Sequence, residues 1–160
     1  MFRVVVAGRG LNGLAPAWER ALPRTDWLVE ASADTIDAVA ECAVHLVADA
    51  GLICIGWTDL VAAAGATALA AGRATAVALP GQARMAGRAV KEALGRVAAR
   101  GFGGGVVLSH FVSVADTPAL RFDDVDDMAR AALDGRNAAN VLACFFNAPR
   151  TEVVALVFAP

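Results

Sequence analysis

The chain has 160 residues and a formal net charge of −2, so nucleic acid and anionic membrane surfaces are poor partners on charge grounds. The length fits a single domain over residues 1–160, and no membrane span is expected because no run of about 18 apolar residues is free of glycine and charge. Hydrophobic residues make up 58% of the chain and charged residues 19%. We therefore expect a sheet covered on both faces, or a homo-oligomer or subunit of a complex that buries apolar surface between chains.

The amino-terminal segment carries a glycine motif between an apolar run and a helical pattern. Residues 3–8 are expected to form a strand and residues 12–22 a helix, with a G-x-G-x-x-G pattern at their junction. In a dinucleotide-binding unit such glycines allow a tight turn, and the backbone approaches a pyrophosphate at the helix N-terminus. The candidate cofactor-binding residues of this turn are Gly8, Arg9, Gly10, Leu11, Asn12 and Gly13.

Glu30 closes the second expected strand, residues 27–31, about 20 positions after the glycine motif. A carboxylate accepts a hydrogen bond from a ribose hydroxyl and repels a 2′-phosphate, which favours NAD, or the adenosine half of FAD, over NADP. The alternative is that a chain rich in glycine and alanine produces the motif by accident. In that case Glu30 is a solvated charge and no cofactor is bound.

Apolar runs alternate with helical patterns along the rest of the chain. Strands are expected over 52–57, 74–79 and 105–111, and helices over 34–49, 59–71, 82–100 and 123–134. The strand runs lack alternation, which is typical of strands buried on both faces and linked by right-handed crossovers. The last two runs, 141–146 and 153–158, flank a turn and favour an antiparallel hairpin. The predicted fold class is α/β, a doubly wound and mostly parallel sheet of about five parallel strands plus this C-terminal hairpin.

Ligands of such sheets bind outside the carboxyl ends of the strands, and His110 falls at one of these ends. Histidine titrates near neutral pH, so His110 is the candidate catalytic acid or base, with Asp116 as the carboxylate that orients it. The alternative is a structural histidine whose ring nitrogens bind backbone groups. The acidic run 123–127 opens a helix, where carboxylates cap free N–H groups, and this interpretation is favoured over a Mg²⁺ or Ca²⁺ site.

The three cysteines, Cys42, Cys54 and Cys144, show no C-x-x-C spacing and no His/Cys/Asp pattern typical of a transition-metal site. An odd number of cysteines without such spacing indicates buried, reduced thiols. The sequence therefore predicts a cytoplasmic location and no bound metal.

The first 81 residues resemble the nucleotide-binding half of NAD(P)-binding Rossmann-superfamily enzymes. The segments VVVAGRGLNGLAPAWERALP, DWLVEAS and GLICIGWTDLVAAAGATALAAGRATAVALPG are most similar to the glucose–fructose oxidoreductase type. The resemblance implies that Trp57 and Thr58 line the cofactor at a strand end. The later strand closes on Ala78-Leu79-Pro80-Gly81 without the lysine of that family, so the family's catalytic residue is absent.

Three functions are compatible with these patterns. The first is an NAD-linked oxidoreductase or dehydrogenase subunit that acts on a small carbonyl or hydroxy substrate, with the cofactor supplying the hydride. The second is a non-catalytic regulatory module that binds a dinucleotide. The third is an oligomeric α/β enzyme with a small-molecule site between subunits and no dinucleotide.

Overall fold

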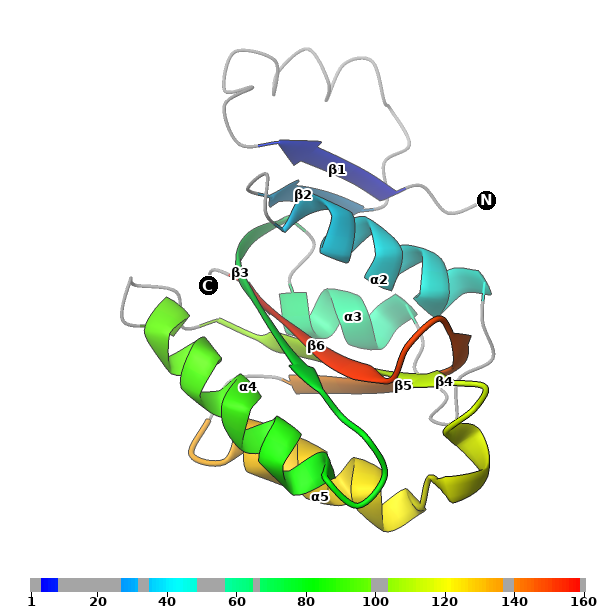
Figure 1. The fold of residues 1–160 in the computed structure, drawn as a ribbon. Helices are drawn as coiled ribbons and strands as arrows, with labels where there is room; N and C mark the ends of the chain where they lie inside the picture. Colours follow the sequence, from blue (N-terminus) through cyan, green and yellow to red (C-terminus); the bar gives the residue numbers. More distant parts are fainter. Residues whose placement is uncertain are drawn as a thin grey trace.

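The computed structural model describes residues 4–8, 27–31, 35–48, 57–64, 67–98, 104–136 and 140–158. The expected helix 12–22 lies outside these residues, and so does the expected strand 52–57 except for Trp57, which begins a helix. Figure 1 shows the elements in chain order: β1 (Val4–Gly8), β2 (Trp27–Ala31), α2 (Ile36–Ala48), α3 (Trp57–Ala64), β3 (Thr67–Val77), α4 (Ala83–Ala98), β4 (Val106–Ser113), the 3₁₀ turn η1 (Thr117–Ala119), α5 (Phe122–Leu133), β5 (Asn140–Ala148) and β6 (Glu152–Phe158).

The strands form one six-stranded sheet in the order β1-β2-β3-β6-β4-β5. The pairs β1–β2, β2–β3 and β4–β5 are parallel, whereas β6 is antiparallel to both of its neighbours, β3 and β4. The α/β class is therefore confirmed. The expectation of a sheet of about five parallel strands with a separate hairpin is wrong, because β6 lies antiparallel between the parallel group β1-β2-β3 and the parallel pair β4-β5.

The expected C-terminal hairpin is also wrong. The two strands form over 140–148 and 152–158, but β5 pairs with β4 and lies at the sheet edge, whereas β6 crosses to the centre of the sheet. Every residue from Val153 to Phe158 is buried. A strand that is apolar on both faces gains more in the middle of a sheet, between two covering layers, than in a two-stranded ribbon.

The segment after α3 departs from the expected helix 59–71. The helix α3 ends at Ala64, and β3 occupies Thr67–Val77, so the expected strand 74–79 is the last part of a longer one. The alanine-rich segment at its start has helical propensity but pairs with β2, and tertiary pairing overrides the local preference. Gly72 sits at a register irregularity of β3, where an added Cβ would lie 2.5 Å from Val97 Cγ1 on α4. The glycine therefore permits a close approach between the strand and the helix.

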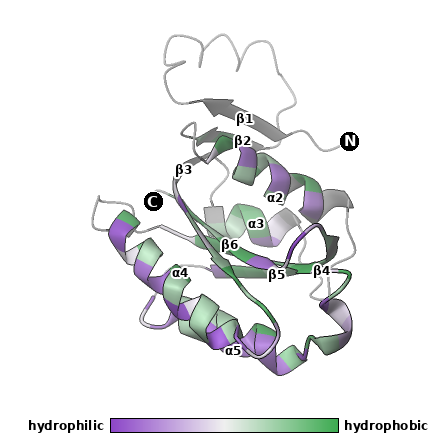
Figure 2. Ribbon diagram, in the orientation of Figure 1, coloured by the Kyte–Doolittle hydropathy of each residue, from purple (hydrophilic) through white to green (hydrophobic). Residues whose placement is uncertain are grey.

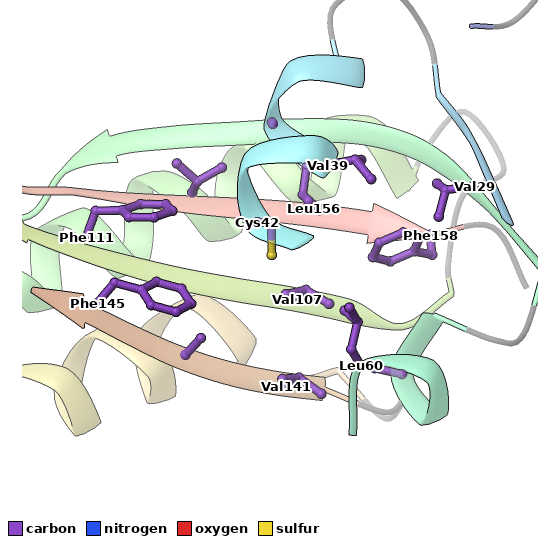
Figure 3. Packing of buried hydrophobic residues seen from close by; sticks show 14 of the residues in the cluster. Val29, Val39, Cys42, Leu60, Val107, Phe111, Val141, Phe145, Leu156 and Phe158 are labelled. Carbon is purple, nitrogen blue, oxygen red and sulfur yellow. The ribbon is translucent and has the colours of Figure 1, made fainter. Parts of the chain in front are cut away.

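Helices cover both faces of the sheet, with α2 and α3 on one side and α4 and α5 on the other (Figure 1). On the α2 side, Val39 and Cys42 from α2 and Leu60 from α3 pack on the sheet, and Phe111 stacks on Phe145 with ring centroids 5.4 Å apart (Figure 3). On the other side, α4 buries the i, i+4 series Ala86, Val90 and Leu94 against β3, β4 and β6. The two cores explain why β4 is buried from Val106 to Val112.

Six expected helices and strands agree closely with the structure: β1 for 3–8, β2 for 27–31, α2 for 34–49, α4 for 82–100, β4 for 105–111 and α5 for 123–134. Figure 2 shows hydrophilic and hydrophobic residues alternating along α4 and α5, as expected for helices that cover a sheet with one face only. Among the described residues, no helix combines the length and the apolar character needed to cross a bilayer.

Candidate functional site

The carboxyl ends of β3, β4 and β5 meet at one edge of the sheet. The register fixes this edge, because Glu152 at the start of β6 lies opposite both Val77 of β3 and Phe111 of β4. Three connections leave from it: the β3–α4 loop 78–82, the segment 114–121 that leads into α5, and the β5–β6 turn 149–151. We call this the carboxyl edge, and it is where the sequence predicts a site.

A hydrogen-bonded group of Ser113, Asp116 and Thr151 joins two connections of the carboxyl edge. Ser113 Oγ donates to Asp116 Oδ2 at 2.8 Å, and the Thr151 hydroxyl donates to the same carboxylate oxygen. Thr151 Oγ1 also accepts the Ser113 N–H at 3.0 Å. The hydrogen bonds from Thr151 and then Ser113 lower the pKa of the Asp116 carboxyl, because they stabilise its charged form. This group fixes the end of β4 to the start of β6.

His110 lies in the interior of the protein beneath this edge, with 0% of its surface exposed. Its ring is on the α4–α5 side of β4, beside Cys144 of β5, its partner in the strand register. Within the described residues, neither Nδ1 nor Nε2 has a hydrogen-bond partner of good geometry. Burial lowers the pKa of His110 because it penalises the imidazolium, and the nearby Ala78 carbonyl and Asp124 carboxylate oppose this effect only in part.

The structure does not bring His110 and Asp116 together. The carboxylate of Asp116 binds Thr151 and Ser113, whereas the groups that affect the His110 ring are the Ala78 carbonyl and the Asp124 carboxylate. The structural alternative proposed for His110, a ring whose nitrogens bind backbone groups, also stays open, since the Ala78 carbonyl lies close enough to affect the ring. A catalytic role for His110 stays a prediction, and its side chain has no exposure to solvent.

Two of the residues predicted to bind a cofactor, Gly8 and Glu30, lie at adjacent positions of the paired strands β1 and β2, because Gly8 is opposite Ala31. Gly8 ends β1, and Glu30 lies within β2, opposite Ala7 of β1 and Leu69 of β3. Trp57 and Thr58 begin α3 and so do not form a strand end, and Thr58 is exposed. The other five, Arg9, Gly10, Leu11, Asn12 and Gly13, lie outside the described residues, so their turn stays a prediction.

The acidic run 123–127 caps a helix, as the sequence favours. Asp124 Oδ2 accepts the Arg121 N–H at 3.1 Å, and its Oδ1 accepts the Gly81 N–H at 3.2 Å. The second bond ties the β3–α4 loop to the start of α5. Gly81 has a φ of +75°, a left-handed conformation that favours glycine in this loop. No group of three or more potential metal-binding side chains exists within the described ranges.

Most of the exposed large apolar side chains lie in or next to the connections of the carboxyl edge, a feature that the sequence analysis missed. Of the six large hydrophobic residues exposed in the described structure, five lie in or next to its connections, and the sixth, Val44, is on α2. Exposure of the five ranges from 38% to 66%. They are Val77, Leu79, Met85, Val114 and Phe122. Sequence patterns could not separate these residues from core residues, because each adjoins an apolar strand or an amphipathic helix.

Solved structures of FtsZ share this fold. A mutant FtsZ from M. jannaschii superposes with a TM-score of 0.57 and 17% identity, covering 99% of this chain and 56% of that one. The structure titled as an empty FtsZ dimer from the same organism gives a TM-score of 0.58 and 18% identity, covering 99% of this chain and 55% of that one. A GTPγS-bound protofilament of CetZ2 from Haloferax volcanii gives 0.47 and 12%, with 99% and 54% covered. No family model and no curated protein matches the sequence.

This chain therefore has the FtsZ fold and spans about 55% of the length of the FtsZ structures it matches. The resemblance to Rossmann-superfamily dehydrogenases is wrong, since the structural neighbours are FtsZ and the sheet order differs from a doubly wound sheet. The assignment of NAD or FAD and the NAD-linked oxidoreductase function fall with it. Neither alternative, the dinucleotide-binding regulatory module or the intersubunit small-molecule enzyme, agrees better with these neighbours.

A second surface feature is a polar groove between α4 and α5, with a volume of about 380 Å³. Its walls are charged, and its lining includes Arg84, Arg88, Lys91, Asp127, Arg130 and Asp134. Lys91 Nζ contacts Asp134 Oδ2 at 2.5 Å, and Arg130 Nε contacts Asp126 Oδ2 at 2.6 Å. The groove lies on the outer face of the helical layer, away from the α2 side of the sheet.

Proposed function

We propose that this chain is a self-associating structural module with the FtsZ fold, and that its copies bind each other through the carboxyl edge. The observation that carries the proposal is the concentration of exposed apolar side chains there, five of the six in the described structure. Monomeric proteins scatter such residues, whereas a gathered group is typical of an interface. The apolar composition of the chain, 58% hydrophobic, supports the same conclusion.

The fold supports self-association as the function of this edge, because one of the matched FtsZ structures is titled a dimer. The groups at the edge also fit a binding surface better than a reaction site. Asp116 is held by Ser113 and Thr151, and His110 is buried below the surface. A polar cluster that is already satisfied rigidifies the connections and leaves the apolar side chains to make contacts.

The expected association is concentration-dependent and modest in strength. Burying an exposed side chain of this type completely contributes about 1.5–3 kcal/mol, and these are already partly buried. Association itself costs roughly 4–15 kcal/mol in lost translational and rotational freedom. The net free energy of association is therefore small, and the assembly should dissociate on dilution.

Sedimentation velocity over a wide concentration range tests the proposal with the full chain. We expect the weight-average mass to rise with concentration, and the variant Leu79→Ser/Phe122→Ser to need at least about tenfold more protein for the same rise, since about 1.4 kcal/mol is tenfold. Val44→Ser is the matched control, because Val44 is 62% exposed but lies on α2. A monomer at every concentration, or an edge variant that behaves like the control, would contradict the proposal.

A further inference from the structure

The two helices on the outer face of the layer carry opposite charge. The helix α4 has four basic residues, Arg84, Arg88, Lys91 and Arg96, and one acidic residue, Glu92. The helix α5 has the reverse, four aspartates between 123 and 127 and one basic residue, Arg130. One chain therefore displays a basic helix and an acidic helix with equal and opposite excess charge.

These helices lie side by side and run in the same direction. Gly81, just before α4, binds Asp124 in the first turn of α5, and Lys91 binds Asp134 just beyond the end of α5. Between these points Gly87 packs against Met128. The face is thus two parallel helices wide, and Arg84 and Asp127, both lining the groove, stand at the same level along it.

Part of the charge on this face is not neutralised within the chain. Lys91 and Arg130 have carboxylate partners, but Arg84 and Arg88, one turn apart on α4, have no ion pair in the part of the chain that the structure describes. The same holds for Asp127 in the groove wall. These groups point to a partner that supplies an acidic strip for α4 and a basic strip for α5.

We infer that a second copy of this chain docks on the α4–α5 face, about a twofold axis parallel to the helices. Such an axis keeps the helix direction and exchanges the two sides, so that α4 of each copy lies over α5 of the other. Arg84 then faces the partner's Asp127, and Lys91 faces the partner's Asp134. The basic side chains of α4 and the acidic side chains of α5 then both face opposite charge. A uniformly acidic or uniformly basic partner would complement only one of the two helices.

The size of the face indicates a weak contact. A 16-residue helix is about 24 Å long, and two adjacent helices are about 20 Å wide. The face therefore offers roughly 500 Å² per copy, below the roughly 800 Å² per partner of a standard interface. Exposed ion pairs contribute little each and are screened by salt. The inference rests on the proposed self-association and adds a lateral contact to the one at the carboxyl edge.

The test uses the full chain in the Leu79→Ser/Phe122→Ser background, where the apolar edge contact is weakened. In this edge variant we expect the dissociation constant of the residual dimer to rise roughly fivefold or more between low salt, about 50 mM, and about 300 mM. Two charge-reversed forms are then made in the same background. One carries Arg84→Glu and Arg88→Glu, and the other carries Asp127→Lys and Asp134→Lys.

Each reversed form alone should be monomeric at low salt, because two strips of like charge meet. An equimolar mixture of the two should restore the dimer, since the twofold arrangement then pairs opposite strips on both sides. Arg73→Glu is the control reversal, because Arg73 is exposed on β3 and lies outside the α4–α5 face. Circular dichroism and the thermal midpoint verify that each form is folded. Recovery of the dimer in the mixture is further evidence that both reversed forms are folded.

The outcomes separate this inference from the proposed function. An edge variant that is monomeric even at high concentration and low salt overturns the α4–α5 contact, while loss of wild-type association in that variant still supports the edge. A reversed form that dimerises like its parent, or a mixture that stays monomeric, also overturns the contact. A wild-type chain that is monomeric throughout overturns both proposals.

Discussion

The backbone of α4 at Gly87 lies directly against the Met128 carbonyl oxygen of α5. An added Cβ would meet that oxygen and would also come within 2.8 Å of Ala131 Cβ. The contact sets the distance between the two helices that carry the charged strips. It is a close approach that only the absence of a side chain allows.

Gly87→Ala should therefore destabilise the protein although alanine favours helices. The gain in helix propensity is about 1 kcal/mol, whereas overpacking at a helix–helix contact costs about 1–3 kcal/mol. Gly95→Ala is the matched control on the same helix, because an added Cβ there meets nothing within 4 Å. Urea unfolding should show a lower midpoint for Gly87→Ala and a higher one for Gly95→Ala. A stabilised Gly87→Ala would show that the helices separate without cost.

His110 should make the stability depend on pH. Its pKa is lowered in the folded state by burial, so the unfolded chain binds a proton more readily. The stability that neutral His110 contributes is fully present above the pKa of the unfolded chain, about 6.5. As the pH falls from there towards the pKa of the folded protein, the free energy of unfolding decreases by at most roughly 1.4 kcal/mol per pH unit. Chemical denaturation at pH 5 to 8 measures this. His110→Leu should flatten the dependence in that range and should raise stability at pH 8, because two unpartnered ring nitrogens leave the core.

If the variant keeps the wild-type slope between pH 5 and 6.5, another group is responsible. His45→Gln is the control, since His45 is the second histidine of the chain and lies on α2 against Phe111, with ring centroids 5.1 Å apart. That substitution should leave most of the slope in place.

The sequence predicts the elements whose pattern is local. The bounds of α2, α4 and α5 follow from the spacing of apolar residues, and β2 and β4 follow from short apolar runs. The start of β3 could not be found this way, because Thr67 to Ala71 is alanine-rich and becomes a strand through its pairing with β2 and β6. The position of β6 is equally non-local. The continuous apolar pattern of β6 indicates a strand in the interior of a sheet, but it does not indicate which two strands lie beside it.

The candidate site was harder to predict than the fold. The motif with Gly8, Gly10 and Gly13 directs attention to the amino terminus, yet its spacing alone does not separate the FtsZ fold from a doubly wound dehydrogenase. The sequence predicts His110 at a strand end, whereas it lies in the middle of β4, and its depth depends on α4 and α5 packing over that strand. The exposed apolar residues of the carboxyl edge, such as Leu79 and Phe122, become visible only when burial is known.

Thr151 should be important for stability although it lies in a turn. It is 5% exposed, and its hydroxyl accepts the Ser113 N–H at 3.0 Å and contacts Asp116. Thr151→Val keeps the shape but leaves that N–H without its partner, at a cost of about 1–3 kcal/mol. Thr75→Val is the control, because Thr75 is exposed on β3. Thermal unfolding should show a clear loss for the first and almost none for the second, and equal midpoints would contradict the role of the Thr151 hydroxyl.

Cys42 and Cys144 should resist alkylation in the folded protein. Burial raises the pKa of each thiol to about 11, and the Ser109 hydroxyl, 3.5 Å from Cys42 Sγ, offsets this only in part. The thiolate is the nucleophile, so a pKa about two units above the ordinary value reduces the reactive fraction near pH 8 by roughly 100-fold, before any loss of access. In a Cys54→Ala background, iodoacetamide labelling followed by mass spectrometry should be slow in buffer and fast in denaturant. Rapid labelling of Cys42 in buffer would mean that α2 opens from the sheet, and rapid labelling of Cys144 would mean the same of α5, because these helices cover the two thiols.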